Sequence, residues 1–206
     1  MGYLKKYEWE LVAENLPRVK RNCPKCNEKT YYINSEKFRV NANKNNIDVW
    51  LIYQCEKCKS TWNMTIYERI KPKDINKCEY EKFLSNNKEL VREYAFNLGI
   101  YNKNKAEIIL EDIDYKIIEK KLEAYYINEN ELVIEIACKY PADIRVDKLL
   151  SDNLGVSRSE IKNMHKKGLI AIKDDKNSLN TKIKNRMEIH ILQKPMENVE
   201  ILEAIV

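Results

Sequence analysis

The chain has 206 residues, of which 44% are hydrophobic and 33% are charged, so it is long enough for two small domains or for one core with an appendage. No apolar run approaches the roughly 18 residues of a membrane span, and the first residues lack the apolar stretch of a secretory signal. These features argue against a membrane or secreted protein and predict a cytoplasmic one whose cysteines are reduced.

The net charge of +5 is unevenly distributed. Residues 17–75 hold 13 Lys and Arg against 6 Asp and Glu, residues 76–140 hold 10 against 13, and residues 141–194 hold 12 against 7. Two basic ends around an acidic middle suit a polyanionic partner that is contacted at two places. Lysine placed on ordinary solvated faces would give the same pattern.

The glycines and histidines argue against an enzyme. Rossmann and P-loop sites need clustered glycines, so that the backbone can approach a phosphate. Neither histidine stands in a recognisable arrangement with a nucleophile. The four glycines are far apart, at Gly2, Gly99, Gly155 and Gly168. We therefore predict no catalytic activity.

Residues 1–22 are expected to form a short extended lead-in to the first of two Cys-x-x-Cys motifs. The spacer in each motif lets two thiolates point at one centre, and four thiolates form the closed tetrahedral site that structural zinc prefers. A thioredoxin-like redox pair would explain one motif but not two, and disulfides would require export. Iron or an iron–sulfur cluster takes the same ligands. The predicted zinc ligands are Cys23, Cys26, Cys55 and Cys58.

Strands are predicted between and after the two motifs. An Asn-rich turn over residues 41–46 separates two of them, and the alternation of apolar and polar residues after this turn leads directly into the second motif. The predicted strands cover residues 31–33, 38–40, 47–54 and 61–66. Strands that meet at two cysteine turns form a zinc ribbon, in which the metal replaces a core too small to hold itself. Trp50 and Trp62 are expected to cover that small core or, alternatively, to stack on nucleobases.

A mixed helical and β scaffold is predicted for the acidic middle. One helix with an apolar face begins after Asn86 or Asn87 and ends at Gly99. Residues 113–127 and 131–138 are expected to pair as a β-hairpin, although the first arm also fits a helix. The remaining cysteines, Cys78 and Cys138, are expected to be reduced packing residues.

Two helices and a strand are predicted near the C-terminus. Apolar spacing indicates a helix that ends at Gly155, and the sequence from Ser157 to Glu160 is a capping box that opens a second helix, which ends at Gly168. The strand then covers residues 169–172. On the second helix a cation recurs every four residues, which suits phosphate contact near a helix N-terminus, although a solvated face has the same pattern. These cations are Arg158, Lys162 and Lys166.

The order of helix, Ser-Arg-Ser-Glu turn, helix, glycine and strand resembles the alpha-L motif. This small RNA-binding fold occurs in a ribosomal small-subunit protein, bacterial tyrosyl-tRNA synthetases and many pseudouridine synthases. Residues 145–150 match its Arg-aliphatic-Asp opening and residues 168–170 its Gly-aliphatic strand, whereas residues 173–176 and 186–187 depart from it. The resemblance implies that the two helices contact structured RNA. The residues predicted to do so are Arg145, Lys148, Ser157, Arg158, Lys162, Lys166 and Lys167.

Most of the chain also resembles a bacterial family named domain of unknown function 1062. The resemblance rests on the first Cys-x-x-Cys motif, the segments 38–43 and 48–53, and Thr61-Trp62-Asn63 after the second motif. It implies no particular activity, because that family is named for the lack of one.

Together these patterns predict an α+β protein with a zinc ribbon over residues 1–75, a mixed scaffold over 76–140, and an alpha-L-like domain with an acidic apolar tail over 141–206. The predicted function is non-catalytic binding of structured RNA, ribosomal or transfer RNA, by a protein that carries Zn²⁺. The alternative is a protein-interaction adaptor whose ribbon and tail bind another protein. The apolar and acidic residues 197–206 motivate that alternative.

Overall fold

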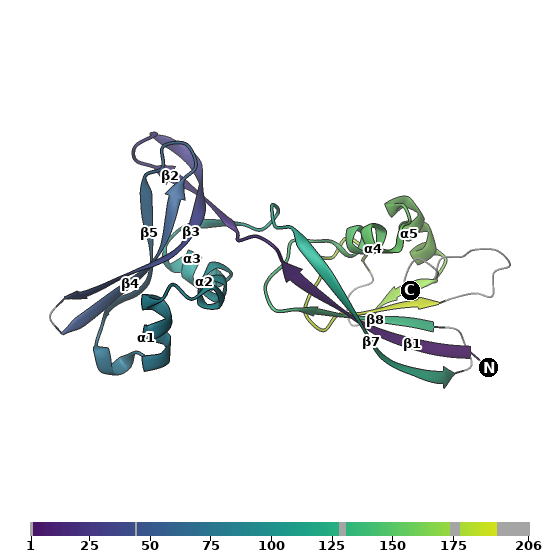
Figure 1. Cartoon of the computed structure of the whole chain (residues 1–206). Helices are drawn as coiled ribbons and strands as arrows, with labels where there is room; N and C mark the ends of the chain where they lie inside the picture. The colour runs from purple at the N-terminus through teal and green to yellow at the C-terminus, as the bar shows by residue number, and fades with distance from the viewer. Residues whose placement is uncertain (1, 44, 128–130, 174–177, 193–206) are drawn as a thin grey trace. The chain divides into compact units, whose positions relative to one another are not determined.

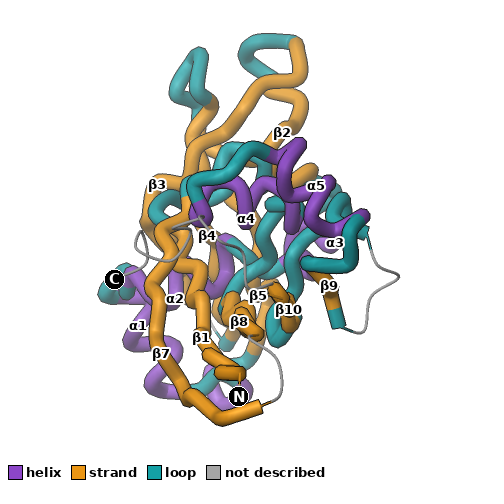
Figure 2. Tube along the Cα trace, turned by 90° about the vertical axis from the view of Figure 1, so that its right-hand side faces the viewer, coloured by secondary structure: helices purple, strands orange, loops and turns teal. Residues whose placement is uncertain are grey.

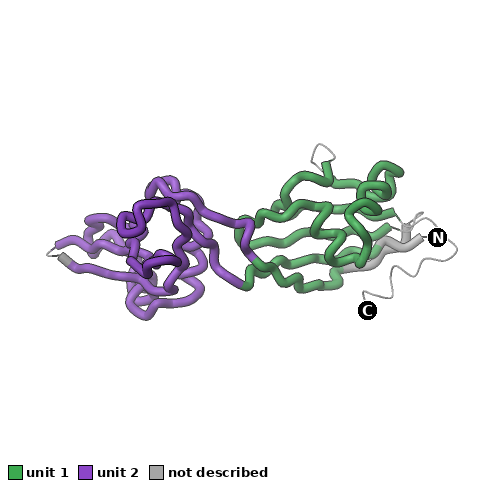
Figure 3. Tube along the Cα trace, turned by 90° about the horizontal axis from the view of Figure 1, so that it is seen from above, with its two compact units in different colours: residues 1–14, 114–206 green, residues 15–113 purple. Residues whose placement is uncertain are grey.

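The computed structural model describes residues 2–43, 45–127, 131–173 and 178–192 (Figure 1). The chain forms two compact units, which Figure 3 distinguishes by colour. Unit 1 comprises residues 1–14 and 114–206, and unit 2 comprises residues 15–113. Each unit has its own five-stranded sheet, and helices accompany both sheets, so the fold is α+β (Figure 2).

This division differs from the three consecutive segments that the sequence predicts. The described residues of unit 1 begin with a strand whose pairing partners lie more than a hundred residues further along the chain. Unit 2 is therefore an insertion between the first strand of unit 1 and the remainder of that unit.

The sheet of unit 2 is antiparallel, with strand order β5-β4-β3-β2-β6. The four segments expected to be strands around the cysteine motifs all lie in strands, but residues 31–33 and 38–40 belong to a single long strand, β3. Asn43 of this strand pairs with Asn46 at the end of the ladder. The strands are β2 (Arg18–Cys23), β3 (Glu28–Asn43), β4 (Asn46–Cys55), β5 (Thr61–Ile70) and β6 (Glu107–Ile109).

Three short α-helices follow β5, and an asparagine caps each of them. The side chains of Asn76, Asn87 and Asn97 accept hydrogen bonds from backbone N–H groups of the following turn. The prediction of one helix that ends at Gly99 is wrong, because the helix capped by Asn87 stops at Ala95 and the next cap starts another. The elements are η1 (Pro72–Asp74), α1 (Lys77–Leu84), α2 (Lys88–Ala95) and α3 (Leu98–Lys103).

Unit 2 has a hydrophobic core of its own. Fifteen buried residues from the sheet and the three helices form one cluster, which includes Leu51, Tyr53 and Phe83. The expectation that a metal replaces a missing core is therefore wrong for this unit. Trp62 packs against the cluster, with its ring 5.6 Å from that of Tyr53, whereas strand alternation places Trp50 on the opposite face of the sheet.

One side chain covers the middle of the edge strand β5. The Asn104 carboxamide accepts a hydrogen bond from Thr65 N at 2.9 Å and donates one to Thr65 O at 2.9 Å. A second bond from Asn104 Nδ2 to Ile100 O ties this amide to the end of α3, and Lys103 Nζ donates to Ile66 O at 3.1 Å. The amide thus pairs with Thr65 as a neighbouring strand would.

The sheet of unit 1 has the strand order β7-β1-β8-β10-β9. Strand β1 pairs antiparallel with β7 on one side and parallel with β8 on the other. Strand β10 pairs antiparallel with both β8 and β9. The strands are β1 (Gly2–Ala13), β7 (Tyr115–Ile127), β8 (Glu131–Cys138), β9 (Ile170–Ile172) and β10 (Glu188–Leu192).

Two predictions for these segments are wrong. The supposed lead-in contains the strand β1, in which Trp9, Leu11 and Ala13 are buried and alternate with more exposed residues. The segments 113–127 and 131–138 contain the strands β7 and β8, which do not form a hairpin with each other, because β1 lies between them. Both β7 and β8 pair with β1, and no local sequence pattern predicts this shared partner.

The helices α4 (Val146–Leu154) and α5 (Arg158–Lys166) cover one face of this sheet (Figure 1). Their predicted ends are confirmed: Gly155 has φ +66° after α4, Ser157 Oγ accepts a hydrogen bond from Glu160 N, and Gly168 has φ +72° just beyond α5. A positive φ at these turns favours glycine over any residue with a Cβ. In the part of the chain that the structure describes, no helix has the length and apolarity that crossing a membrane requires.

Candidate metal centre

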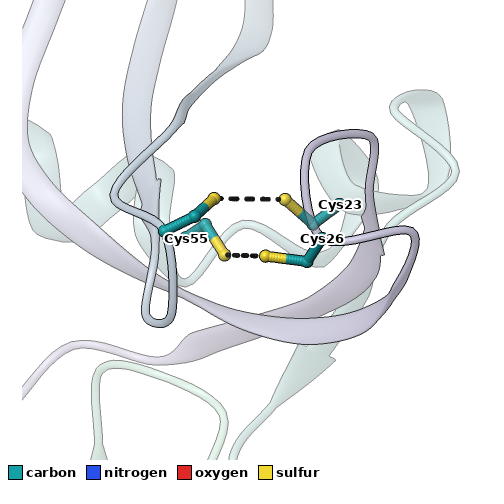
Figure 4. Close-up of side chains that lie close together, drawn as sticks. Cys23, Cys26 and Cys55 are labelled. Atoms are coloured by element: carbon teal, nitrogen blue, oxygen red, sulfur yellow. Dashed lines mark hydrogen bonds between the residues drawn. The ribbon is translucent and has the colours of Figure 1, made fainter.

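The four cysteines of the two motifs come together in unit 2 (Figure 4). The Sγ atoms of Cys23 and Cys58 are 3.5 Å apart, those of Cys26 and Cys55 are 3.9 Å apart, and all four lie within 4.8 Å of one another. Four sulfurs at about 2.3 Å from one tetrahedral ion would be separated by about 3.8 Å, so this spacing fits a single metal ion. All four thiols are free, which agrees with separations far beyond the roughly 2 Å of a disulfide.

Two equivalent turns hold the thiols in place. Cys23 is the last residue of β2 and Cys55 is the last residue of β4. In each turn the residue after the second cysteine is left-handed, with φ 57° at Asn27 and 60° at Lys59. Its N–H donates to the carbonyl oxygen of the first cysteine, at 2.9 Å in the first turn and 3.0 Å in the second. The same backbone geometry therefore presents two thiols from each side.

Two hydroxyl groups contact the thiols from outside the motifs. Ser60 Oγ lies 3.0 Å from Cys58 Sγ and 3.4 Å from Cys23 Sγ, and Thr30 Oγ1 lies 3.3 Å from Cys55 Sγ. Thr30 is only 3% exposed. Neither residue is among those predicted from the sequence. Ser60 follows the second motif closely enough to be found from spacing, whereas Thr30 comes from β3 and no spacing rule indicates it.

Without a bound ion, the pKa values of the thiols differ from one another. A hydrogen bond with Ser60 is the main reason that the pKa of Cys23 falls to about 5. A hydrogen bond with Cys58 is the main reason that the pKa of Cys26 rises to about 12. Because neighbouring thiolates repel one another, four of them need a cation at their centre, and a divalent metal ion would supply that charge.

A protein cation also lies beside the first turn. The Arg21 guanidinium stands over the ring of Trp62, 4.2 Å from its centroid, and 5.4 Å from the centroid of Tyr32. Burial lowers the pKa of Arg21. Lys57, which lies inside the second motif, is engaged by Glu28 at 2.7 Å on the surface.

In unit 1, three of the residues predicted to contact RNA converge on one carboxylate. Asp147 is fully buried in the first turn of α4. Its Oδ2 accepts hydrogen bonds from Arg158 Nη2 at 2.6 Å and Nε at 3.2 Å, and Lys162 Nζ lies 3.9 Å from the same oxygen. Arg145 Nε lies 3.4 Å from Oδ1. Asp147 is the aspartate of the Arg-aliphatic-Asp segment 145–150, and no pattern in the sequence predicts this role for it.

The other predicted RNA-contacting residues surround this cluster without joining it. The side chain of Ser157 caps α5 by accepting the N–H of Glu160. Lys148 on α4 and Lys166 and Lys167 at the end of α5 are exposed and form no ion pair with another described residue. On α5, Arg158 and Lys162 are therefore paired with Asp147, whereas Lys166 is not.

The two cysteines outside the quartet differ from each other. Cys78 is exposed near the start of α1, so its expected packing role is wrong. Cys138 is half-buried at the end of β8 and packs against the core of unit 1, and burial raises the pKa of its thiol. The tail residues 197–206, which motivated the adaptor alternative, lie outside the described residues.

A protein-family model described as "Protein of unknown function (DUF1062)" matches residues 40–176. The chain belongs to this family. The segment that matches DUF1062 starts within β3 and includes the second cysteine pair and the cluster around Asp147, whereas Cys23 and Cys26 precede it. Comparison with the curated proteins and with the solved structures found no match.

Proposed function

We propose that this DUF1062 protein is a non-catalytic, zinc-containing protein that binds structured RNA, ribosomal or transfer RNA, through α4 and α5. In this proposal the strands and cysteine turns of unit 2 are a zinc ribbon, and the region from α4 to β9 is an alpha-L-like domain. The observation that carries the RNA-binding part is the set of cations on the exposed side of the two helices.

Zinc is the metal that best suits the four cysteines. An all-thiolate set in a closed, tetrahedral arrangement is typical of structural zinc sites, with iron as the main competitor. Elemental analysis of the purified, reduced protein should find one zinc per chain. Cys55→Ser should lower that occupancy and Cys78→Ser, which changes an exposed cysteine outside the quartet, should not. Protein without bound metal, or with iron as the bound metal, would overturn the zinc assignment.

The cationic side chains of α4 and α5 support the proposal of RNA binding by their number and exposure. The side chains of Arg145, Arg158 and Lys162 are 44%, 41% and 51% exposed although they gather around Asp147. Lys148, Lys166 and Lys167 extend the cationic surface along both helices. Phosphates of a folded RNA can be neutralised by such a surface, with release of counterions.

The test removes cations without disturbing the buried carboxylate. Changing Lys148, Lys166 and Lys167 together to Glu should weaken binding of a fully paired RNA hairpin strongly. It should also lower the slope of log affinity against log salt by about two to three, since each phosphate contact in a duplex contributes about 0.9. The matched control changes three exposed lysines on the helices of unit 2, Lys77, Lys82 and Lys88, to Glu.

The control variant should bind the hairpin like the parent. Equal binding by the parent and the unit 1 variant would remove α4 and α5 as the RNA-binding surface. Absence of RNA binding by the parent protein would leave the adaptor function ahead.

A further inference from the structure

Asp147 lies at the centre of the cationic residues of unit 1, and the main chain fixes its position. It is 0% exposed, and its backbone N–H donates to Leu179 O at 3.0 Å. It is also one of two buried polar residues among those that the structure describes, the other being Thr30 beside the cysteines. A buried carboxylate is stable only when it is paired and hydrogen-bonded.

The number of cations around it exceeds what neutralising its charge requires. One arginine bound through Nε and Nη2 would neutralise the carboxylate, yet Lys162 and Arg145 also approach it, while Oδ1 accepts no hydrogen bond from another described residue. One negative and three positive charges leave a net charge of +2 at a place where the three cationic side chains are about half exposed. The arrangement therefore concentrates positive charge at the surface around a fixed, buried point.

The geometry of Arg158 determines which of its N–H groups can bind a further acceptor. A guanidinium has five N–H donors in one rigid plane. Two of its nitrogens, Nε and Nη2, face Asp147, so Nη1 and the outer edge of the plane remain for another acceptor. A long cationic side chain that is already held in one conformation loses less entropy when it binds a phosphate than a freely rotating one does.

We propose that Asp147 is a positioning residue that holds Arg158, with Lys162 and Arg145, as a preformed phosphate-binding cluster for the backbone of paired RNA. This inference rests on the proposed RNA-binding function and adds a specific organiser to it. A carboxylate would here strengthen the binding of a polyanion, which is the opposite of its direct electrostatic effect.

That opposition provides the test, which uses the full-length, metal-loaded protein and a fully paired RNA hairpin. Asp147→Asn removes a negative charge, so long-range electrostatics alone predicts tighter binding. Loss of positioning predicts weaker binding, by about tenfold when two side chains lose their fixed conformations. The matched control is Asp152→Asn, which makes the same charge change at an exposed position of the same helix, and it should bind as tightly as the parent or more tightly.

A second measurement needs no RNA. The Nε–Hε group of Arg158 should give a slowly exchanging NMR signal in the parent and should become as mobile as that of exposed Arg186 in Asp147→Asn. Arg158→Lys, which keeps the charge but loses the planar group, should also weaken RNA binding. That variant serves as the binding test if Asp147→Asn does not fold, as judged by the indole signal of buried Trp9.

The outcomes distinguish the positioning role of Asp147 from the proposed RNA-binding function. A parent that binds the hairpin while the folded Asp147→Asn variant binds equally well or more tightly overturns the positioning role and leaves the proposed function intact. Equal binding by Arg158→Lys, or an Arg158 signal that is already mobile in the parent, does the same. A parent that does not bind the hairpin overturns both.

Discussion

Removal of the metal should destabilise unit 2 and leave unit 1 unaffected, because each unit has a separate core. Structural zinc contributes roughly 10 kcal/mol or more of apparent binding free energy in small modules, and a whole domain has about 5–15 kcal/mol of stability. Because unit 2 keeps its own cluster of buried residues, we expect the loss in its unfolding free energy to be smaller than the full binding energy, about 5 kcal/mol. The disorder should begin at the two cysteine turns and the ends of β2 and β4.

The indole signals of the three tryptophans report separately on the two units in one NMR spectrum. Trp62 packs 5.6 Å from Tyr53 and carries Arg21 over its ring near the thiols, so its indole signal should change most as a chelator removes the metal. Trp50, on the other face of the same sheet, should change over the same range of chelator concentration but to a smaller extent. Trp9 belongs to unit 1, is 3% exposed and donates to Glu119 at 2.8 Å, so its signal should stay unchanged.

The same titration on Cys55→Ser should start from a spectrum that already resembles the metal-free form, whereas Cys78→Ser should behave as the parent does. A Trp9 signal that changes together with that of Trp62 would refute the independence of the two cores. An unchanged Trp62 signal after verified loss of the metal would refute the structural role of the site.

Three further outcomes can be measured. Thr30→Val should weaken zinc binding about tenfold in a chelator competition, because it removes the hydroxyl next to Cys55, and unchanged affinity would contradict this role. Gly155→Ala should lower the stability of unit 1 by about 1 kcal/mol in thermal unfolding, because alanine is strained at the positive φ of this position while its added Cβ meets nothing within 4 Å. An unchanged unfolding midpoint would argue against this backbone strain. A hydrogen bond from Lys173 is the main cause that lowers the pKa of Glu188. The ionised Glu188 therefore stabilises unit 1 above the pKa that this residue has in the unfolded chain, and the stabilisation is lost as pH falls through its pKa in the folded protein. Glu188→Gln should therefore make the acid unfolding of unit 1 less steep, which circular dichroism can follow, and identical acid curves would count against this contribution.

Local patterns predicted the parts of the fold that local interactions decide. The alternation before Cys55, the glycine after α4 and the capping box at Ser157 all involve residues within a few positions of each other. The strand in residues 2–13 is not among the predicted elements, although Trp9 and Leu11 alternate in it with charged residues.

Other features depend on which distant segments meet, and a single sequence does not encode that choice in any short pattern. Strand β1 separates β7 from β8 because its two edges together offer more pairing than a hairpin between those two strands. The four ligands were identifiable from spacing, but the hydroxyl of Thr30 reaches Cys55 only through the pairing of β3 with β4. Asp147 likewise meets Arg158 only after α4 and α5 have packed on the sheet.

The amide of Asn104 bears on how this protein behaves at high concentration. A long edge strand such as β5 can recruit a strand from another chain, which is a common route to aggregation and domain swapping. Both hydrogen-bonding groups of Thr65 are already occupied by Asn104, and Lys103 occupies the carbonyl oxygen of Ile66. An incoming strand would have to displace both side chains and would leave the Lys103 ammonium without its carbonyl partner. The end of α3 thus protects the middle of β5 against the joining of two copies edge to edge.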